Sequence, residues 1–387
     1  MDIFSYLAAA LSPAHLLLML FGMVFGIVIG AMPGLTPTLG VALLIPMTFR
    51  LSAEAGLIVL GAVYIGAVYG GHITAVLIGI PGAPAAIATT FDGFPMNKNG
   101  FGQRALNIGV TSSFIGGLLG VCSLILFAPA LAHLTLAFGP AENFWVALFG
   151  IAVIASLAID NFWKGIVSGM LGLLLSFVGT SAMTGIARFT FGQSSLIGGI
   201  SVVPALIGMF SIPQVISLFC NPSTHIISDV NKYQEENHPL RDALYVIKKP
   251  FALGLASVIG VVIGIPGAGG QVGGIVAYDW VKRTSKDKEQ FGGGFPDGVI
   301  ASQSSANATV GGALVPLLTL GIPGSATAAV LLGGLLIHGL FPGANLFTAH
   351  ADVTYTFIWS LFLAHLVLLP LGFMGARVFS NINSLKF

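Results

Sequence analysis

Long apolar segments alternate with short polar ones along almost the whole chain. Six apolar runs have about the length, roughly 20 residues, that a helix needs to cross a bilayer. They are residues 14–32, 105–131, 142–160, 165–183, 196–220 and 354–375. Glycine and proline interrupt four further apolar stretches, at 38–49, 56–91, 251–278 and 299–341. The pattern predicts an all-α polytopic membrane protein with about ten membrane-embedded segments.

The interrupted stretches occur at matching places in the two halves of the chain. The first half contains VFGIVIGAMPGLTP (24–37) and then YGGHITAVLIGIPGAPAA (69–86). The second contains SVIGVVIGIPGAGG (257–270) and then VGGALVPLLTLGIPGSATAA (310–329). Small residues also serve close helix packing in membranes, but each Pro-Gly pair should end one helix and start another. Four such breaks at matching places predict two related repeats with re-entrant or discontinuous helices.

The repeats and the polar stretch between them divide the chain into five parts. Residues 221–250 carry many charged side chains, and lysines flank the apolar segment that follows, so this loop is predicted to be cytoplasmic. The predicted parts are a first repeat with broken helices (1–95), connecting transmembrane helices (96–220), the polar loop (221–250), a second repeat with broken helices (251–345) and a C-terminal transmembrane helix (346–387).

Composition agrees with a membrane protein and excludes several functions. The chain is 55% hydrophobic and only 7% charged, whereas soluble globular proteins carry about 25% charged residues. Its net charge of +1 offers no basic face for nucleic acid. The sequence contains none of the GxxxxGK[ST], HExxH or GxSxG motifs, so we predict no enzyme and no cofactor other than a coupling Na+ or H+.

The breaks are the predicted binding site. Within a bilayer, backbone N–H and C=O groups that lack helical hydrogen bonds are tolerated only where they are buried in protein or line a water-filled cavity. A helix N-terminus can hold a carboxylate without a buried lysine or arginine, and the breaks contain no basic residue. Glycine would let the backbone approach a ligand closely, and nearby hydroxyls and amides would bind its remaining oxygens. The candidates are Gly34, Thr36, Thr38, His72, Thr74, Gly82, Gly267, Gly269, Gln271, Gln303, Ser304, Asn307, Gly324, Ser325 and Thr327.

Each candidate also has a structural interpretation. A hydroxyl can bond back to its own helix, and His72 can be a packed ring rather than a titrating group. Neutral oxygens of Ser304, Asn307 and Thr327 suit a sodium ion, and this is the coupling that we favour. Protons carried by His72, Asp92 or Asp297 are the alternative, although either aspartate can equally cap a helix end.

The motifs resemble those of a known family, the large membrane subunit of the tripartite tricarboxylate transporters (TctA-type). The resemblance rests on GAMPGLTPTLGVALLIPMTF, YGGHITAVLIGIPGAPAAIATTFDGFPM and GGALVPLLTLGIPGSATAAVLLGGLLIHGLFPG, and extends from about residue 15 to about residue 347. It implies uptake of citrate-like or other small carboxylates across the bacterial inner membrane, driven by an ion gradient. The partners that it implies are a small membrane subunit and a periplasmic solute-binding receptor. Gln303 stands where relatives usually have a glutamate, and relatives continue beyond the last predicted helix.

Two other functions stay open on the sequence alone. A channel-like pore also contains broken helices, but pores usually show a ring of charge or a carbonyl filter. A truncated scaffold that does not transport is the other alternative. Uptake with and without an imposed ion gradient would separate these functions.

Overall fold

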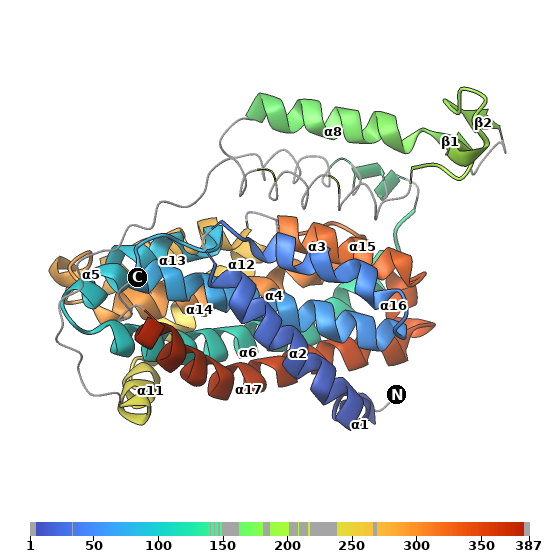
Figure 1. Cartoon of the computed structure of the whole chain (residues 1–387). Helices are drawn as coiled ribbons and strands as arrows, with labels where there is room; N and C mark the ends of the chain where they lie inside the picture. The colour runs from blue at the N-terminus through green and yellow to red at the C-terminus, as the bar shows by residue number, and fades with distance from the viewer. Residues whose placement is uncertain are drawn as a thin grey trace.

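The structure, a computed structural model, describes residues 5–32, 34–139, 141–142, 144–145, 148, 162–180, 186–200, 208, 216, 238–265 and 269–382, and it is predominantly helical (Figure 1). The helical elements of the first half are α1 (Ser5–Ala10), α2 (Pro13–Gly30), α3 (Pro37–Thr48), α4 (Ala53–Leu77), η1 (Pro84–Thr89), α5 (Thr90–Lys98), α6 (Gly102–Thr135), α8 (Phe162–Ser176) and η2 (Ser194–Leu196). Those that follow are α11 (Pro239–Ile247), α12 (Pro250–Gly264), α13 (Gly269–Thr284), η4 (Lys288–Gln290), α14 (Pro296–Leu320), α15 (Ala326–Ile337), α16 (Ala344–Thr348) and α17 (Ala351–Ile382).

Four of the described helices, α2, α4, α6 and α17, are long and apolar enough to cross a membrane. A fifth span is possible if α11 and α12, which meet at a 76° bend, count as one. The predicted runs 14–32, 105–131 and 354–375 lie within or close to α2, α6 and α17. The runs 142–160 and 196–220 fall largely outside the described residues. Membrane character is thus supported, whereas the prediction of about ten segments stays untested.

Helices end at each of the four interrupted motifs. α2 stops at Gly30 and α3 starts at Pro37, α4 stops at Leu77, and α12 stops at Gly264. Gly321 ends α14 in a left-handed conformation with φ of 71°, which glycine adopts without strain. Pro81 and Pro323 lie between helices, while Pro33 and Pro266 are outside the described residues. The chemistry of proline and glycine therefore located these helix ends correctly.

Two predicted segments differ from the structure. The run 165–183 is wrong as a continuous helix, because α8 ends at Ser176 and a short antiparallel strand pair follows, β1 (Gly179–Thr180) with β2 (Ala187–Arg188). The 221–250 stretch is not wholly a loop, because its end forms α11. α11 has a strongly amphipathic sequence, PLRDALYVI, and proline at its first position favours helix initiation.

Close helix packing depends on glycines at the contacts. α2 packs on α4, α12 packs on α14, and α6 packs on α14. A side chain at Gly22 would come within 2.7 Å of the Val59 carbonyl, and one at Gly120 within 2.6 Å of the Ala308 carbonyl. The helix backbones therefore touch directly, as small residues permit in membrane proteins.

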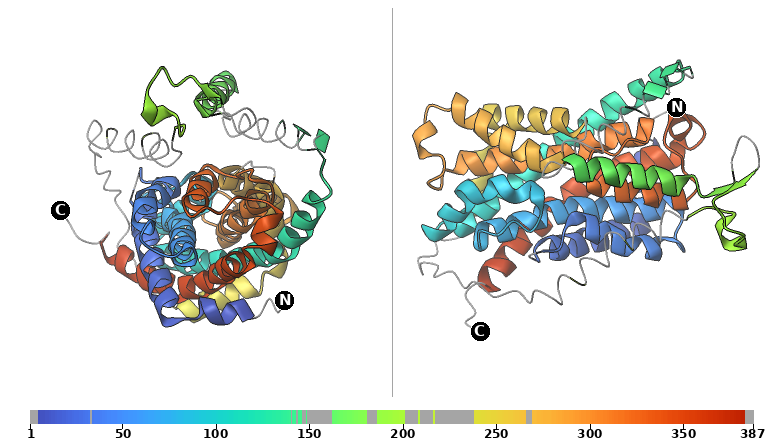
Figure 2. Two further views of the ribbon diagram at one scale, coloured as in Figure 1. Left: turned by 90° about the vertical axis from the view of Figure 1, so that its right-hand side faces the viewer. Right: turned by 90° about the horizontal axis from the view of Figure 1, so that it is seen from above.

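Elements from opposite halves of the chain also meet. α3 packs against α15, and α13 packs against η1. α3 and α13 each follow the first break of their own half, and η1 and α15 each follow the second break. Each contact therefore joins the segment after the first break of one half to the segment after the second break of the other half. Seen end-on, α8 lies apart from the other helices, while helices of both halves of the chain form one bundle (Figure 2).

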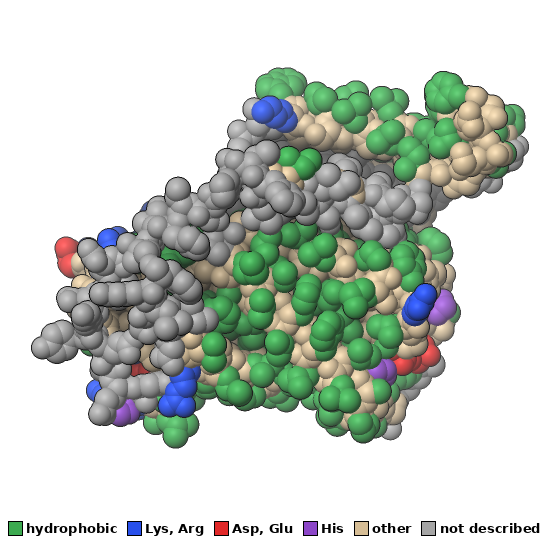
Figure 3. All heavy atoms as spheres, viewed as in Figure 1, with side chains coloured by type: hydrophobic (Ala, Val, Ile, Leu, Met, Phe, Trp, Pro, Cys, Tyr) green, Lys and Arg blue, Asp and Glu red, His purple; other side chains and the backbone are tan. Residues whose placement is uncertain are grey.

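The surface separates apolar and charged side chains. Hydrophobic side chains cover the middle of the face shown in Figure 3, and lysine, arginine and acidic side chains gather toward its left and right ends. On α2, Leu17, Phe21 and Val28 are exposed. An apolar belt between two charged ends is the surface expected of a protein in a bilayer.

Candidate functional site

The first helical turns of α3 and α15 lie side by side. Thr36 caps α3 by accepting a hydrogen bond from the Leu39 amide (3.3 Å), and Ser325 caps α15 by accepting one from the Ala328 amide (3.1 Å). Thr38 and Thr327, the second residue of each helix, are joined through their hydroxyls at 3.0 Å. Each helix N-terminus carries about half a positive charge, so this pairing places two such ends together.

A tyrosine from α4 holds one of these ends. The hydroxyl of Tyr64 lies 2.8 Å from that of Ser325, and both side chains are buried. Tyr64 was absent from the sequence-predicted site. It lies within the apolar helix α4, and burial of a tyrosine usually requires a partner for its O–H. That requirement is the signal that could have identified it.

Gln303 is the centre of a second buried cluster. Its amide nitrogen donates to the Thr89 hydroxyl at 2.6 Å, and its amide oxygen accepts from Ser113 at 3.1 Å. Thr89 in turn lies 3.0 Å from Ser302. The cluster joins η1, α6 and α14, and Gln303 has no solvent exposure. Sequence reasoning selected Gln303 but not Ser113 or Ser302, whose partners belong to other helices or to η1.

The three residues predicted to hold sodium have different partners. Ser304 donates to the Ile300 carbonyl of its own helix (2.7 Å), and Thr327 is paired with Thr38. Asn307 donates to the Gln303 carbonyl (3.3 Å), while its amide oxygen is buried without a partner among the described residues. The described residues contain no group of three or more histidine, cysteine or acidic side chains that could hold a metal. The sodium role of this trio remains a prediction.

Glycines at the breaks make room for other parts of the backbone. A Cβ atom at Gly82 would overlap the carbonyl oxygen of Gly30, and one at Gly324 would overlap that of Gly264. The Gly82 amide donates to the Gly71 carbonyl at 3.2 Å, and Thr74 donates to the same carbonyl at 3.2 Å. Close packing of the chain on itself therefore explains these two glycines. Bulky substitution at either glycine would therefore disturb the fold itself.

The remaining candidates next to the breaks are Gly34, Gly267, Gly269 and Gln271. Gly34 lies in an exposed turn with φ of 86°, a conformation that favours glycine. Gly269 and Gln271 fall in the first turn of α13, and Gly267 is outside the described residues. A Cβ at Gly270 would lie 2.9 Å from the Ala85 side chain, so the start of α13 borders η1.

His72 is fully buried in α4. Its ring packs on the backbone of α6, where a Cβ at Gly109 would collide with the ring. The Tyr69 ring lies 6.0 Å away, centroid to centroid. These contacts give His72 a packing role within the bundle.

Asp92 and Asp297 are held at the ends of helices. Asp92 accepts hydrogen bonds from the amides of Gly292, Gly294 and Phe295 and from the Tyr278 hydroxyl, at 2.8 to 2.9 Å. Asp297 accepts from Tyr245 and Lys249, each at 2.8 Å. Asp92 thus binds the backbone amides that lead into α14, as the capping interpretation expects, whereas Asp297 pairs with the side chains of Tyr245 and Lys249.

Comparison with known proteins gives a consistent result along the chain. The family described as "Tripartite tricarboxylate transporter TctA family" matches residues 16–387. An Agrobacterium vitis relative, "Uncharacterized 52.8 kDa protein in TAR-I ttuC' 3'region", is 33% identical over 379 residues, which cover 96% of this chain and 74% of the relative. A second, "Uncharacterized protein in TAR-II ttuC' 3'region" of the same organism, is 32% identical over 116 residues, covering 30% of this chain and 47% of the relative. No solved structure matches.

Proposed function

We propose, from the finding that this chain belongs to the tripartite tricarboxylate transporter TctA family, that it is the permease subunit of a receptor-dependent secondary transporter. In this proposal it imports a tricarboxylate or another small organic carboxylate across the bacterial inner membrane. A sodium or proton gradient drives uptake. A periplasmic solute-binding receptor delivers the substrate, and a small membrane subunit completes the system.

The paired N-termini of α3 and α15 are the observation that carries the proposed substrate site. Backbone amides in the first turn of a helix lack intrahelical partners and attract anions. Two such turns meet at Thr38 and Thr327, whose hydroxyls can also donate to a carboxylate. No lysine or arginine lies at the described breaks, so helix ends and hydroxyls would carry the recognition. Discontinuous helices with this arrangement are typical of transporter binding sites.

Matching contacts in the two halves support a duplicated unit. A Cβ at Gly26 would meet the Val63 carbonyl, and one at Gly260 would meet the Ser305 carbonyl. Gly70 faces the Ile27 carbonyl as Gly312 faces that of Val261. Gly82 and Gly324 face Gly30 and Gly264 in the same way. Within each element the sequence offset between matched residues is constant, which is what superposable repeats require.

Substrate charge gives the reason for ion coupling. A tricarboxylate brings several negative charges into a medium of low dielectric constant, and two helix ends together supply only about one positive charge. Co-transported cations would supply the remainder. Relatives usually have a glutamate at the position of Gln303. The glutamine amide cannot ionise, so this position cannot carry the coupling proton in this chain.

The test measures carboxylate uptake by vesicles that contain this chain with its two native partners. Sodium and proton gradients are imposed separately, for wild type and for the double variant Thr38→Val with Thr327→Val. We expect gradient-driven uptake in wild type and a loss of at least about tenfold in the variant, since each charge-assisted hydrogen bond contributes about 1.5–3 kcal/mol.

Thr48→Val is the matched control. Thr48 is a buried threonine of the same helix, α3, and donates only to the Ile45 carbonyl at 2.7 Å. It should transport normally. Equal losses in the control and the double variant would show that the paired threonines serve packing alone. Uptake that ignores every gradient would identify a passive pore.

A further inference from the structure

Ser305 and Thr309 place two hydroxyl groups on one face of α14. The Ser305 hydroxyl oxygen is buried without a hydrogen-bond partner among the described residues. One turn along, the Thr309 hydroxyl lies 3.1 Å from the Gly260 carbonyl and 2.8 Å from the Ser305 carbonyl. A hydroxyl has one hydrogen, so it cannot donate fully to both carbonyls. The cluster thus contains more oxygen acceptors than hydrogens.

The two hydroxyls face α13 at a position without a side chain. A Cβ at Gly273 would lie 3.0 Å from the Thr309 hydroxyl oxygen and 3.3 Å from that of Ser305. The oxygens of Ser305, Thr309 and Gly260 therefore converge where α12, α13 and α14 meet.

We propose that the Ser305 and Thr309 hydroxyls, with the Gly260 carbonyl, bind a sodium ion. Hard cations prefer oxygen ligands, and neutral hydroxyls and carbonyls of broken helices hold sodium in transporters. Gly260 lies in the last turns of α12, where the helix dipole is negative and stabilises a cation. The ion would supply part of the positive charge that carboxylate import requires, so the inference rests on the proposed function. It uses a different set of oxygens from Ser304, Asn307 and Thr327.

The matching place in the first half shows that packing does not require these hydroxyls. In the first half, Gly40 matches Gly273 and Val63 matches Ser305. A Cβ at Gly40 would lie 3.3 Å from a methyl carbon of Val63, just as one at Gly273 would lie 3.3 Å from the Ser305 hydroxyl oxygen. Val63 and Ala67 stand opposite Gly26 and Gly30, where Ser305 and Thr309 stand opposite Gly260 and Gly264. An apolar pair fills the same contact in the first half. The hydroxyls of the second half therefore need a reason other than close packing.

The experiment measures the midpoint of thermal unfolding of the purified full chain in detergent, in sodium chloride and in potassium chloride at equal ionic strength. A bound ion stabilises only the folded state, so we expect sodium to raise the wild-type midpoint by several degrees over potassium. The double variant Ser305→Val with Thr309→Ala installs the side chains of the first half and should lose this difference. The control Thr319→Val, which removes a buried hydroxyl of α14 that donates to Val315 (2.7 Å), should keep it.

Two results would overturn the sodium site: no sodium-specific rise in wild type, or a rise that the double variant retains. If the double variant does not fold, Ser305→Ala removes only the unpartnered oxygen and decides by the same criterion. The readout needs neither partner nor carboxylate, so its failure is distinct from a failure of the proposed function. Sodium stabilisation without gradient-driven uptake would support the ion site and reject the transport proposal.

Discussion

Asp92 links the two halves of the chain through a single carboxylate. It extends from α5 and accepts hydrogen bonds from three backbone amides before α14 and from the Tyr278 hydroxyl of α13. The side chain is 1% exposed, so water cannot replace these bonds if the carboxylate is removed. The carboxylate thereby holds the loop that leads into α14.

Replacing Asp92 should therefore destabilise the protein strongly. We expect Asp92→Ala to cost at least about 3 kcal/mol, because several hydrogen bonds to a charged group are lost and buried donors are left unpaired. Thermal unfolding in detergent measures the effect. Asp279→Ala is the control: its carboxylate is 46% exposed and pairs with Arg283 within one helix, which contributes less than about 0.5 kcal/mol. Equal stability of the two variants would contradict the role given to Asp92.

His72 should be replaceable by an apolar side chain. Its ring is buried against Gly109. In the second half, Leu314 of α14 occupies the position that matches His72 of α4. We expect His72→Leu to retain uptake and its ion dependence, because an apolar side chain of similar volume would replace the packed imidazole ring. Vesicle uptake under separate sodium and proton gradients is the measurement. Loss of proton-driven uptake at normal protein abundance would make His72 a coupling residue instead.

Sequence reasoning identified many site residues but not how they pair. Thr38 and Thr327 were chosen because each follows a Pro-Gly break, yet they are 289 residues apart and nothing local indicates that they touch. Tyr64 and Ser113 were missed because their polar role arises only when another helix brings a partner. Periodicity describes one element at a time, whereas these contacts depend on the packing of several.

At the scale of elements, α6 and α14 form a contact in which backbone meets backbone. Cβ atoms at Gly116 and Gly120 would meet the backbone of Ser304 and Ala308, and one at Gly311 would overlap Gly120. This contact brings Ser113 to Gln303 and so fixes the polar centre of the bundle.

A larger residue should force these two helices apart. We expect Gly120→Leu to lower stability by at least about 1–3 kcal/mol, the usual cost of overpacking, with more if the helix backbones must move. Gly254→Leu is the control, because a Cβ at Gly254 of α12 would meet no atom within 4 Å. Thermal unfolding of both variants in the same detergent compares them. A control as unstable as Gly120→Leu would reject the packing argument.

The elements were predicted best where local chemistry determines them. Proline and glycine specify helix ends through backbone geometry, and the ends of α2, α4, α12 and α14 lie at the predicted breaks. Hydrophobicity alone was insufficient at 165–183, where the apolar run continues past Ser176 but the chain turns into β1. α11 was missed because its short amphipathic pattern lies at the end of a strongly polar stretch.

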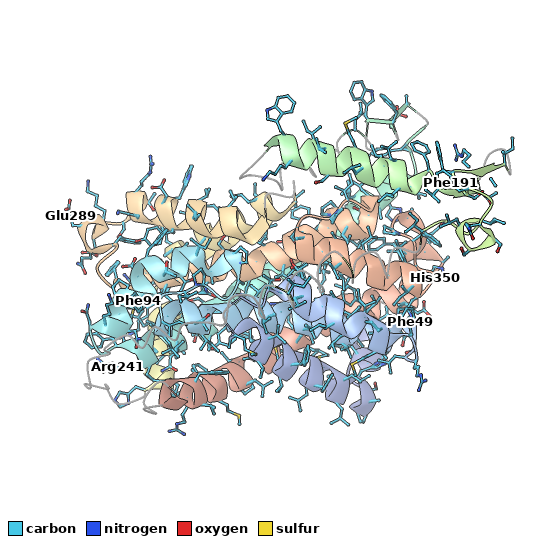
Figure 4. The ribbon with its side chains drawn as sticks, turned by 45° about the horizontal axis from the view of Figure 1, so that its top comes forward. Phe49, Phe94, Phe191, Arg241, Glu289 and His350 are labelled. Carbon is cyan, nitrogen blue, oxygen red and sulfur yellow. The ribbon has the colours of Figure 1, made fainter. Side chains whose placement is uncertain are left out.

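For the whole molecule, the charged ends predict an orientation in the membrane. Phe94, Arg241 and Glu289 lie at one end of the bundle and Phe49 and His350 at the other (Figure 4). Lys98 of α5 and Lys288 of η4 belong to elements at the first end, and Lys249 is the N-cap residue of α12, so the positive-inside rule predicts that this end faces the cytoplasm.

Labelling of introduced cysteines tests this orientation. In a Cys122→Ser, Cys220→Ser background, we expect a membrane-impermeant maleimide to label His350→Cys in intact cells. It should label Glu289→Cys only in inverted vesicles. Labelling of both positions from one side would place the two charged ends on the same face and contradict the membrane arrangement.

α14 has 25 residues, enough to cross a bilayer, yet it is not among the helices apolar enough to do so. Ser302, Gln303, Ser304, Ser305 and Asn307 occupy its middle, and all are withdrawn from solvent by the surrounding helices. A nascent segment of this polarity has no stable place among lipid tails until its partners are present. Ser113 and Thr89, which bond to Gln303, are synthesised earlier in the same chain. We therefore expect the helices of the first half to insert first, and α14 to become stable in the membrane only when it packs against them.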